Sequence, residues 1–221
     1  MSGGDTLHLT LVRHAATAWN GEGRWQGWTD TPLGELGREQ AGRLAWRLAG
    51  TDPGQVHSSD LQRAADTARL ALPGEPLILD VRLRELHFGR YEGATTNSVL
   101  HDPEYAAWQR DPWRLPAPGG GESLQEVAAR LRDWAEELEP GTVTAFTHGA
   151  ALRALLCDLF GWPALPQPGY VLPFPYRHAH TGLTRLVRDS GRWTLLTYND
   201  GAHLETWRHS TAGEEAPRST P

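Results

Sequence analysis

The sequence predicts an α/β fold with three α/β/α layers, in which helices cover both faces of a mostly parallel central sheet. Short apolar runs rich in leucine and valine alternate along the chain with segments whose apolar residues recur at helical spacing. Such alternation is typical of strand–helix–strand units, which place helices on the faces of a parallel sheet. The 221 residues are enough to bury a sizeable core as one domain.

The first half of the chain contains three strand-like segments. The run LHLTLV at residues 7–12 predicts a buried strand, and apolar residues at helical spacing predict a helix over residues 33–49. A short strand, QVHS, then leads to a helix that opens near Ser59, with Ser59 or Asp60 as its N-cap. A third extended segment is expected over residues 76–86.

In the second half, prolines and tryptophans crowd residues 87–122, which we expect to form a small cap inserted over one end of the sheet. Ser123 and Glu126 have capping-box spacing, which predicts a helix that starts there and ends near Leu138. The run GTVTAFT predicts a strand, and a helix follows over residues 150–160. HTGLTRLVRD and RWTLLTYND predict a late hairpin.

We expect one domain over residues 1–208 and a disordered tail over residues 209–221, where small and polar residues predominate. No apolar run approaches the roughly 20 residues of a membrane helix, and the N-terminus lacks the pattern of a secretory signal. We therefore expect a cytoplasmic protein with no membrane partner. The single cysteine, Cys157, agrees with a reducing compartment and is expected to be a small buried apolar residue.

All 21 basic residues are arginines, which excludes catalysis by a Walker lysine or a Schiff-base lysine. The net charge of −6 argues against nucleic acid as the main partner, because such partners usually require a basic face. A small phosphorylated substrate requires only a local cluster of arginines. The composition therefore favours a small-molecule partner over a polyanion.

Four segments bring ionisable residues to one region of the expected fold. Arg13 and His14 follow the first strand, and His148 follows a later one. Arg63 lies on the helix after another strand, and Glu85 lies at the end of an extended segment. Because ligands of open α/β sheets bind outside the carboxyl ends of the strands, we expect these five residues to meet there.

Two histidines, two arginines and one carboxylate are the groups that phosphoryl transfer requires. A neutral imidazole is a good nucleophile toward phosphorus, and a carboxylic acid can protonate the leaving oxygen. Arginine binds phosphate oxygens through a planar fork, which spreads the positive charge over the transferred group. This chemistry requires neither a metal ion nor a cofactor.

Five motifs occur in order along the chain: R-H-x-x-T-x-W-N, G-R-W-Q-G-W-T-D-T-P-L-G-E-L-G, S-S-D-L-Q-R-A-A-D-T-A, R-E-L-H-F-G-R-Y-E-G and T-H-G. Together they resemble the histidine phosphatase superfamily, also called phosphoglycerate mutase-like, over residues 9–204. The resemblance implies a metal-independent phosphomonoesterase, in the phosphatase branch, that acts on small phosphorylated metabolites. It also implies a possible homodimer, since dimers are common in the family.

The resemblance assigns roles to individual positions. His14 would become phosphohistidine, and Glu85 would act first as general acid and then as the base that activates water. Arg13, Arg63 and a cationic His148 would bind the phosphoryl oxygens, so a bell-shaped pH profile is predicted. The wider substrate and phosphate pocket would include Asn20, Gln26 and Gly149, with His180 and Thr181 as secondary candidates.

Ala15 and Ala16 depart from the family pattern, which usually has a glycine and then an acid or amide after the histidine. If the turn required a positive φ, alanine would strain it by roughly 1 kcal/mol or more. A phosphate-binding protein with weakened catalysis is therefore one alternative. A phosphoglycerate mutase is another, although Gln26 and the R-E-L-H-F-G-R-Y-E-G segment resemble the phosphatases more closely.

Two further hypotheses concern residues outside the motifs. His178 and His180 have an H-x-H spacing that can bind a metal ion, but no carboxylate or cysteine lies at a supporting spacing, so we expect no metal site. Trp108 and Trp113 in the expected cap could line an apolar mouth for a substrate with a bulky portion.

Overall fold

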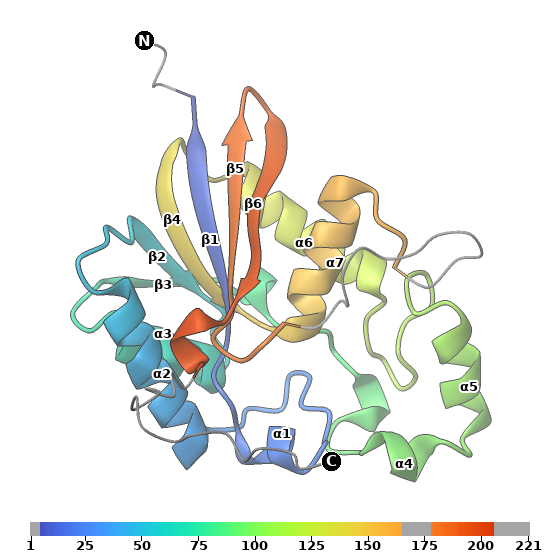
Figure 1. Cartoon of the computed structure of the whole chain (residues 1–221). Helices are drawn as coiled ribbons and strands as arrows, with labels where there is room; N and C mark the ends of the chain where they lie inside the picture. The colour runs from blue at the N-terminus through green and yellow to red at the C-terminus, as the bar shows by residue number, and fades with distance from the viewer. Residues whose placement is uncertain (1–4, 165–177, 206–221) are drawn as a thin grey trace, which may run out of the picture.

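The structure is a computed structural model that describes residues 5–164 and 178–205. A six-stranded sheet lies at its centre, with helices on either side (Figure 1). The strand order is β3-β2-β4-β1-β5-β6. The strands are β1 (Leu7–Arg13), β2 (Gln55–Ser58), β3 (Leu77–Leu79), β4 (Gly141–Thr147), β5 (Leu183–Asp189) and β6 (Arg192–Asp200).

The sheet is mostly parallel, as the sequence predicts. Strand β1 pairs in parallel with β4, β4 with β2, and β2 with β3. On its other side, β1 pairs antiparallel with β5, and β5 forms the predicted hairpin with β6. Only β5 therefore runs against the other strands, and the carboxyl ends of β1, β2 and β4 lie at one edge.

Helices cover both faces of the sheet, which confirms the three-layer prediction. Helices α2 (Glu35–Leu48) and α3 (Gln62–Ala71) pack together on one face, and α6 (Leu124–Glu136) and α7 (Gly149–Phe160) pack on the other (Figure 1). No helix within residues 5–164 and 178–205 is long and apolar enough to cross a membrane. Cys157 is buried in α7, as expected.

Strand β1 supplies side chains to both layers of the core. Leu7, Leu9 and Leu11 pack in the cluster beneath α6 and α7, whereas Val12 packs in the cluster beneath α2 and α3. Successive residues of a strand point to opposite faces, so a strand with helices on both sides needs apolar residues at consecutive positions. Leu11 and Val12 meet this requirement, whereas Leu7, Leu9 and Leu11 alternate with the exposed His8 and the half-buried Thr10.

Residues 87–122 contain short helices and no strand. These are η2 (Gly89–Tyr91), α4 (Thr96–Val99) and α5 (Pro103–Arg110). The other short elements in the described part of the chain are α1 (Ala18–Gly21), η1 (Val81–Leu83) and η3 (Ala202–Leu204). The segment is held by an aromatic cluster, and neighbouring ring centroids in this cluster lie 5.4–6.3 Å apart. Its members are Trp25, Phe88, Tyr91, Tyr105 and Trp108. The predicted tail over residues 209–221 lies outside the described residues.

Two local predictions were wrong. Helix α3 begins at Gln62 rather than near Ser59, and its N-cap, Leu61, makes no side-chain capping bond. The Gln62 N–H instead donates to Asp30 Oδ1 at 2.7 Å, so a distant segment caps the helix. Residues 76–86 are extended only over β3, because Asp80 accepts the Arg82 N–H and starts the 3₁₀ turn η1. The Ser123–Glu126 capping box is confirmed.

Two glycines of α2 provide a matched test of how this helix supports the loop after β1. A Cβ built on Gly37 would overlap the carbonyl oxygen of Ala16, whereas one built on Gly42 meets no atom within 4 Å. We expect Gly37→Ala to lower the free energy of unfolding by about 2 kcal/mol through overpacking. Gly42→Ala should raise it by up to about 1 kcal/mol, because alanine favours the helix. Urea denaturation of both variants measures the contrast, and equal effects would contradict this packing.

Candidate active site

The two central histidines meet because β1 and β4 pair in parallel. In their register Arg13 lies opposite Thr147, and the His14 N–H donates to the Thr147 carbonyl at 2.9 Å. His14 and His148 each follow one residue later, and their ring centroids are 5.1 Å apart. Both rings are buried. The sheet register therefore brings together two residues that are far apart in the sequence.

The His14 ring is oriented by a single backbone hydrogen bond. Its Nδ1 lies 2.8 Å from the carbonyl oxygen of Ala15. A carbonyl only accepts hydrogen bonds, so Nδ1 carries the proton and Nε2 keeps its lone pair. No residue in the described ranges hydrogen-bonds to Nε2. His14 is 2% exposed and lines a cavity, so Nε2 is the ring atom available to a ligand.

Ala15 and Ala16 fit the turn without backbone strain. Among the described residues, the non-glycine positions with positive φ are Thr181, Ser190 and Asn199, so neither alanine is one of them. The Ala15 N–H donates to Thr67 Oγ1 and the Ala16 N–H to Gln40 Oε1, both at 2.9 Å. The strain considered from the sequence therefore does not arise.

Arg63 lies in the first turn of α3 and is fully buried. Its guanidinium donates to the carbonyl oxygens of Thr29 (3.0 Å) and Gly27 (2.7 Å). Glu92 fixes that loop by accepting the N–H groups of Trp28 and Thr29 at 2.8 and 2.9 Å. Burial lowers the pKa of Arg63 to about 10, which leaves the group charged at neutral pH.

Arg13 lies beside His14 at the end of β1. One of its terminal nitrogens donates to the His178 carbonyl, and its buried Nε has no partner within the described residues. Burial lowers its pKa, while Glu85 opposes this effect. Gly149 lets the guanidinium approach α7, since a Cβ there would lie 3.3 Å from Arg13 Nε. Gly149 therefore makes room for Arg13 and is absent from the cavity lining.

Glu85 lies between η1 and η2, facing the start of α7. Its carboxylate accepts the N–H groups of Ala150 (3.2 Å), Ala151 (3.0 Å) and Leu86 (2.9 Å). The first-turn N–H groups of a helix have no partner within the helix, so a carboxylate there is held firmly. Glu85 lines the same cavity as His14. It is the only acid among the lining residues, which also include Arg13 and Arg63.

Asn20 and Gln26 lie at the rim, where they are linked through Thr17. Asn20 Oδ1 accepts from the Thr17 N–H at 3.0 Å and completes the capping box of α1. Gln26 Oε1 accepts hydroxyl hydrogen bonds from Thr17 (3.0 Å) and Thr31. These bonds engage the amide oxygens and leave both NH₂ groups as donors to a ligand.

Burial and the nearby Arg63 and Arg13 lower the pKa values of His14 and His148 well below the ordinary histidine value of 6.5. Neither ring nitrogen of His148 has a partner in the described part of the chain. Both rings are therefore neutral at pH 7 without ligand, which differs from the cationic His148 expected from the sequence. A bound dianion would favour protonation of His148, because opposite charges raise a histidine pKa.

His180 and Thr181 support His14 rather than line the cavity. His180 Nδ1 lies 3.1 Å from the His14 carbonyl oxygen, and the two rings are 5.4 Å apart. Thr181 is buried, donates its N–H to the Arg13 carbonyl, and holds His203 Nε2 through its hydroxyl at 2.8 Å. His178 packs against Tyr198 instead of joining His180. No group of three possible metal ligands occurs within residues 5–164 and 178–205.

A cavity of about 140 Å³ lies at His14, and His148, His180 and Thr181 are not among its lining residues. Its polar lining combines Arg24 with six residues expected from the sequence, which are Arg13, His14, Asn20, Gln26, Arg63 and Glu85. The other lining residues, for which the sequence predicts no role in the site, are Arg24, Trp25, Gly27 and Phe88. Trp108, which was expected at the mouth, is instead buried behind Trp25 in the aromatic cluster, and Trp113 packs against the core. The spacing of the tryptophans in the sequence could not predict that Trp25 rather than Trp108 lines the cavity, because this depends on how residues 87–122 pack against Trp25.

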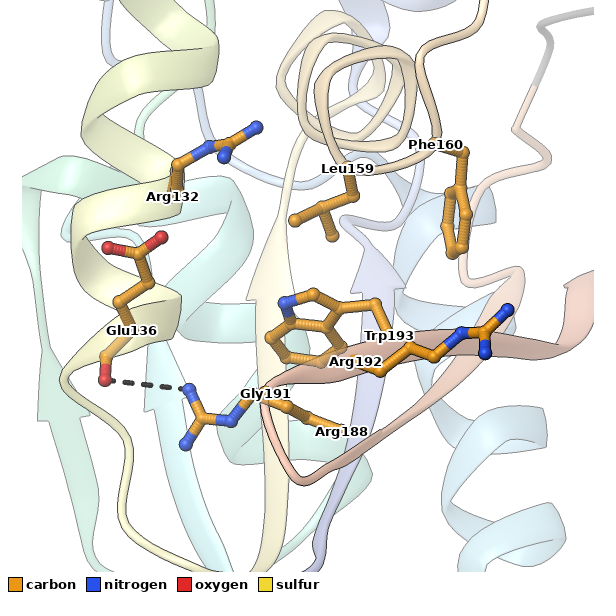
Figure 2. Close-up of a pocket in the computed structure, with 8 residues that line it drawn as sticks. All are labelled: Arg132, Glu136, Leu159, Phe160, Arg188, Gly191, Arg192 and Trp193. Atoms are coloured by element: carbon orange, nitrogen blue, oxygen red, sulfur yellow. Dashed lines mark hydrogen bonds between the residues drawn. The ribbon is translucent and has the colours of Figure 1, made fainter.

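A larger cavity, of about 730 Å³, lies between α6, the end of α7 and the β5–β6 hairpin (Figure 2). Its arginines are mostly engaged with the protein: Arg132 pairs with Asp158, and Arg188 donates to the Ala135 and Leu138 carbonyl oxygens. None of the residues expected to react lines this cavity. The smaller cavity is therefore the candidate active site.

Comparison with known proteins agrees with this assignment. A family model described as the histidine phosphatase superfamily (branch 1) matches residues 9–201. A glucosyl-3-phosphoglycerate phosphatase from Mycolicibacterium vanbaalenii is 36% identical over 89% of this chain and 96% of its own length. A metal-independent phosphoserine phosphatase from Arabidopsis thaliana is 32% identical over 91% of this chain and 85% of its own.

Mutases are also similar to this chain. A 2,3-bisphosphoglycerate-dependent phosphoglycerate mutase from Gloeobacter violaceus is 40% identical over 68% of this chain and 74% of its own length. Among solved structures, Bacillus stearothermophilus YhfR superposes with a TM-score of 0.78 at 32% identity, covering 90% of this chain and all of that one. The α/β fold expected from the sequence is thus shared with a solved relative.

The buried histidines predict how stability depends on pH. Burial lowers the pKa of His178 and of His180 to about 4, with Arg13 adding to the effect. Between pH 6.5 and 4 the unfolded chain binds protons that the folded chain does not, so the free energy of unfolding should fall as pH decreases from 7 to 5. Urea denaturation at pH 7, 6 and 5 measures this slope.

His178→Phe should make that slope shallower, because it removes a titrating group whose ring nitrogens have no partner within the described residues. His101→Phe, at an exposed position before α5, is the matched control and should keep the wild-type slope. A wild-type slope in His178→Phe would refute the assigned cause.

Proposed function

This chain belongs to the histidine phosphatase superfamily, and from that premise we propose that it is a metal-independent phosphomonoesterase of small phosphorylated metabolites that forms a phosphohistidine at His14. The observation that carries the proposal is the hydrogen bond from His14 Nδ1 to the Ala15 carbonyl oxygen. It leaves Nε2 unprotonated and directed to a cavity that also contains Arg13 and Arg63. An uncharged nucleophile flanked by fixed cations suits attack on a phosphoryl dianion.

The proposed reaction has two displacements at phosphorus. In the first, His14 Nε2 forms a bond to phosphorus, the bond to the ester oxygen breaks, and Glu85 gives a proton to that oxygen. In the second, water loses a proton to Glu85, attacks phosphorus and releases phosphate from His14. Arg13, Arg63 and His148 stabilise the non-bridging oxygens in both steps.

A phosphoglycerate mutase is the second candidate, favoured by the 40% identity to a protein of that name. The two reactions differ in the fate of phosphohistidine, which is hydrolysed in one and passed to a second hydroxyl in the other. Incubation with 3-phosphoglycerate, with and without 2,3-bisphosphoglycerate, separates them. A phosphatase releases phosphate in both cases, whereas a mutase yields 2-phosphoglycerate.

The remaining inferences concern the setting of the enzyme. We place it in the cytoplasm as one domain over residues 1–208, supported by its single buried cysteine, Cys157. The partner is a small phosphorylated molecule rather than a nucleic acid or a membrane, supported by the net charge of −6. A homodimer is the proposed assembly.

The first test compares hydrolysis of p-nitrophenyl phosphate by the wild type and by His14→Ala in excess EDTA. Wild-type turnover should survive chelation, and the variant should lose about 10³-fold or more, because the nucleophile is gone. His8→Ala is the matched control, since His8 lies on the same strand but faces solvent.

If the wild type shows no turnover yet binds phosphate, the protein is a binding module and the proposed activity is wrong. If turnover disappears in EDTA and returns with an added divalent ion, the metal-independent mechanism is wrong.

The pH dependence of kcat/KM provides a second test. His14 must be neutral to attack phosphorus, and its pKa lies well below 6.5. We therefore expect kcat/KM to remain high as pH decreases from 7 through 6, and to fall only at lower pH. Initial rates from pH 4 to 8 measure this. An acidic limb centred at pH 6.5 or above would contradict the lowered pKa.

A further inference from the structure

Two side chains outside the cavity converge on the backbone of Glu85. The Glu85 carbonyl oxygen accepts the indole N–H of Trp28 at 2.8 Å and Nη2 of Arg130 at 2.9 Å. Trp28 comes from the loop after α1, and Arg130 comes from the middle of α6. A carbonyl oxygen has two lone pairs, so these two donors saturate it.

Arg130 makes the full number of hydrogen bonds that an arginine can make. Nη1 donates to the carbonyl oxygens of Arg82 (2.6 Å) and Arg84 (2.7 Å). Nε and Nη2 donate to the two carboxylate oxygens of Glu122 at 2.9 and 3.0 Å. With the bond to Glu85, all five N–H groups have acceptors. A lysine has three donors and cannot reproduce this arrangement.

Glu122 extends the contact to the other side of Glu85. Its carboxylate accepts the His87 N–H at 2.9 Å, and its own N–H donates to the His87 carbonyl at 2.9 Å. The Arg130–Glu122 pair therefore holds the backbone on both sides of Glu85. Both side chains are less than one-fifth exposed, so this pair is screened less by water than a surface ion pair.

Trp28 uses its polar group in the same way. The ring is partly exposed, with the Arg84 guanidinium 4.8 Å from its centroid and the His87 ring 4.8 Å away. Its backbone N–H is held by Glu92. The indole therefore has a fixed position from which its N–H reaches Glu85.

We propose that Trp28 and Arg130 are positioning residues that place the Glu85 carboxyl group for proton transfer to the leaving oxygen. This inference rests on the proposed function, in which Glu85 is the proton donor. Proton transfer needs a donor–acceptor distance of about 2.6–3.2 Å, and a displacement of about 1 Å can cost about 10²-fold in rate. The α7 N–H groups hold the carboxylate itself, while Trp28 and Arg130 hold the backbone from which it extends.

The leaving group supplies a readout that general destabilisation would not change. An alkyl phosphate such as glycerol 3-phosphate expels a strongly basic oxygen and depends on the proton. p-Nitrophenyl phosphate expels a weakly basic oxygen and depends on it far less. Displacement of Glu85 should therefore reduce kcat for the alkyl ester more than for the aryl ester, whereas partial unfolding reduces both equally.

The experiment measures kcat and KM on both substrates for Trp28→Phe and Arg130→Lys. Glu85→Gln is the reference, with an expected loss about 10²-fold larger on the alkyl ester. We expect a differential loss of about 3- to 10-fold for Trp28→Phe and of about 10-fold or more for Arg130→Lys, mainly in kcat. If Arg130→Lys does not fold, Trp28→Phe carries the test.

Matched controls remove the same side-chain types elsewhere. Trp46→Phe alters a tryptophan that is 81% exposed on α2, and Arg132→Lys alters an arginine of α6 that pairs with Asp158. Neither should show a difference between the two substrates.

A double-mutant cycle shows whether Trp28 acts through Glu85. In the Glu85→Gln background, Trp28→Phe should cause no additional differential loss, because the proton donor is already absent. Two results would overturn the proposal. One is an equal loss of kcat on both substrates for Trp28→Phe. The other is that Trp28→Phe causes the same differential loss in the Glu85→Gln background as in the wild type. Failure of the proposed function is distinguishable, since the wild type would then hydrolyse neither ester.

Discussion

The parallel pairing of β1 with β4 is the constraint on which the site depends. The hydrogen-bonded register runs from Leu7 opposite Gly141 to Arg13 opposite Thr147, so both strands end at the same level. Each strand buries apolar side chains on both faces, and a slip of one residue would exchange every side chain between two differently shaped layers. Because a slip would disrupt packing throughout the core, the register is fixed, and with it the separation of His14 and His148.

The site is held largely by backbone groups rather than by opposite charges. Arg63 rests on carbonyl oxygens, and Glu85 rests on N–H groups at the start of α7. A carboxylate on Arg63 would neutralise the charge that a phosphoryl group needs, whereas carbonyl dipoles hold the guanidinium and leave its charge available. The cost is a concentration of positive charge around two buried histidines, which lowers their pKa values. The same buried arginine charges that would attract a phosphoryl group therefore also favour the neutral form of both histidines.

Sequence patterns were sufficient where local chemistry decides the structure. The leucines and valine of β1, the Ser123–Glu126 capping box and the Arg13–His14 pair each carry their own signal. Patterns failed where a distant segment intervenes, as when Asp30 caps α3 or when Trp25 takes the place expected for Trp108. The hydrogen bonds of Arg130 could not be predicted from the sequence for a related reason. Three of the five go to backbone carbonyl oxygens, which every residue possesses.

The cavity has two sides of different origin. Arg13, His14 and Arg63, which we propose to hold the phosphoryl group, lie at a strand end or a helix start, whereas Arg24, Trp25 and Phe88 come from connecting segments. Loops tolerate substitution and insertion better than the sheet edge does. Under the proposed function, evolution can therefore exchange the connecting segments without changing the residues proposed to act at phosphorus. A scaffold divided in this way permits relatives that share phosphoryl transfer but differ in substrate, and it allows protein engineers to change substrate selectivity separately from catalysis.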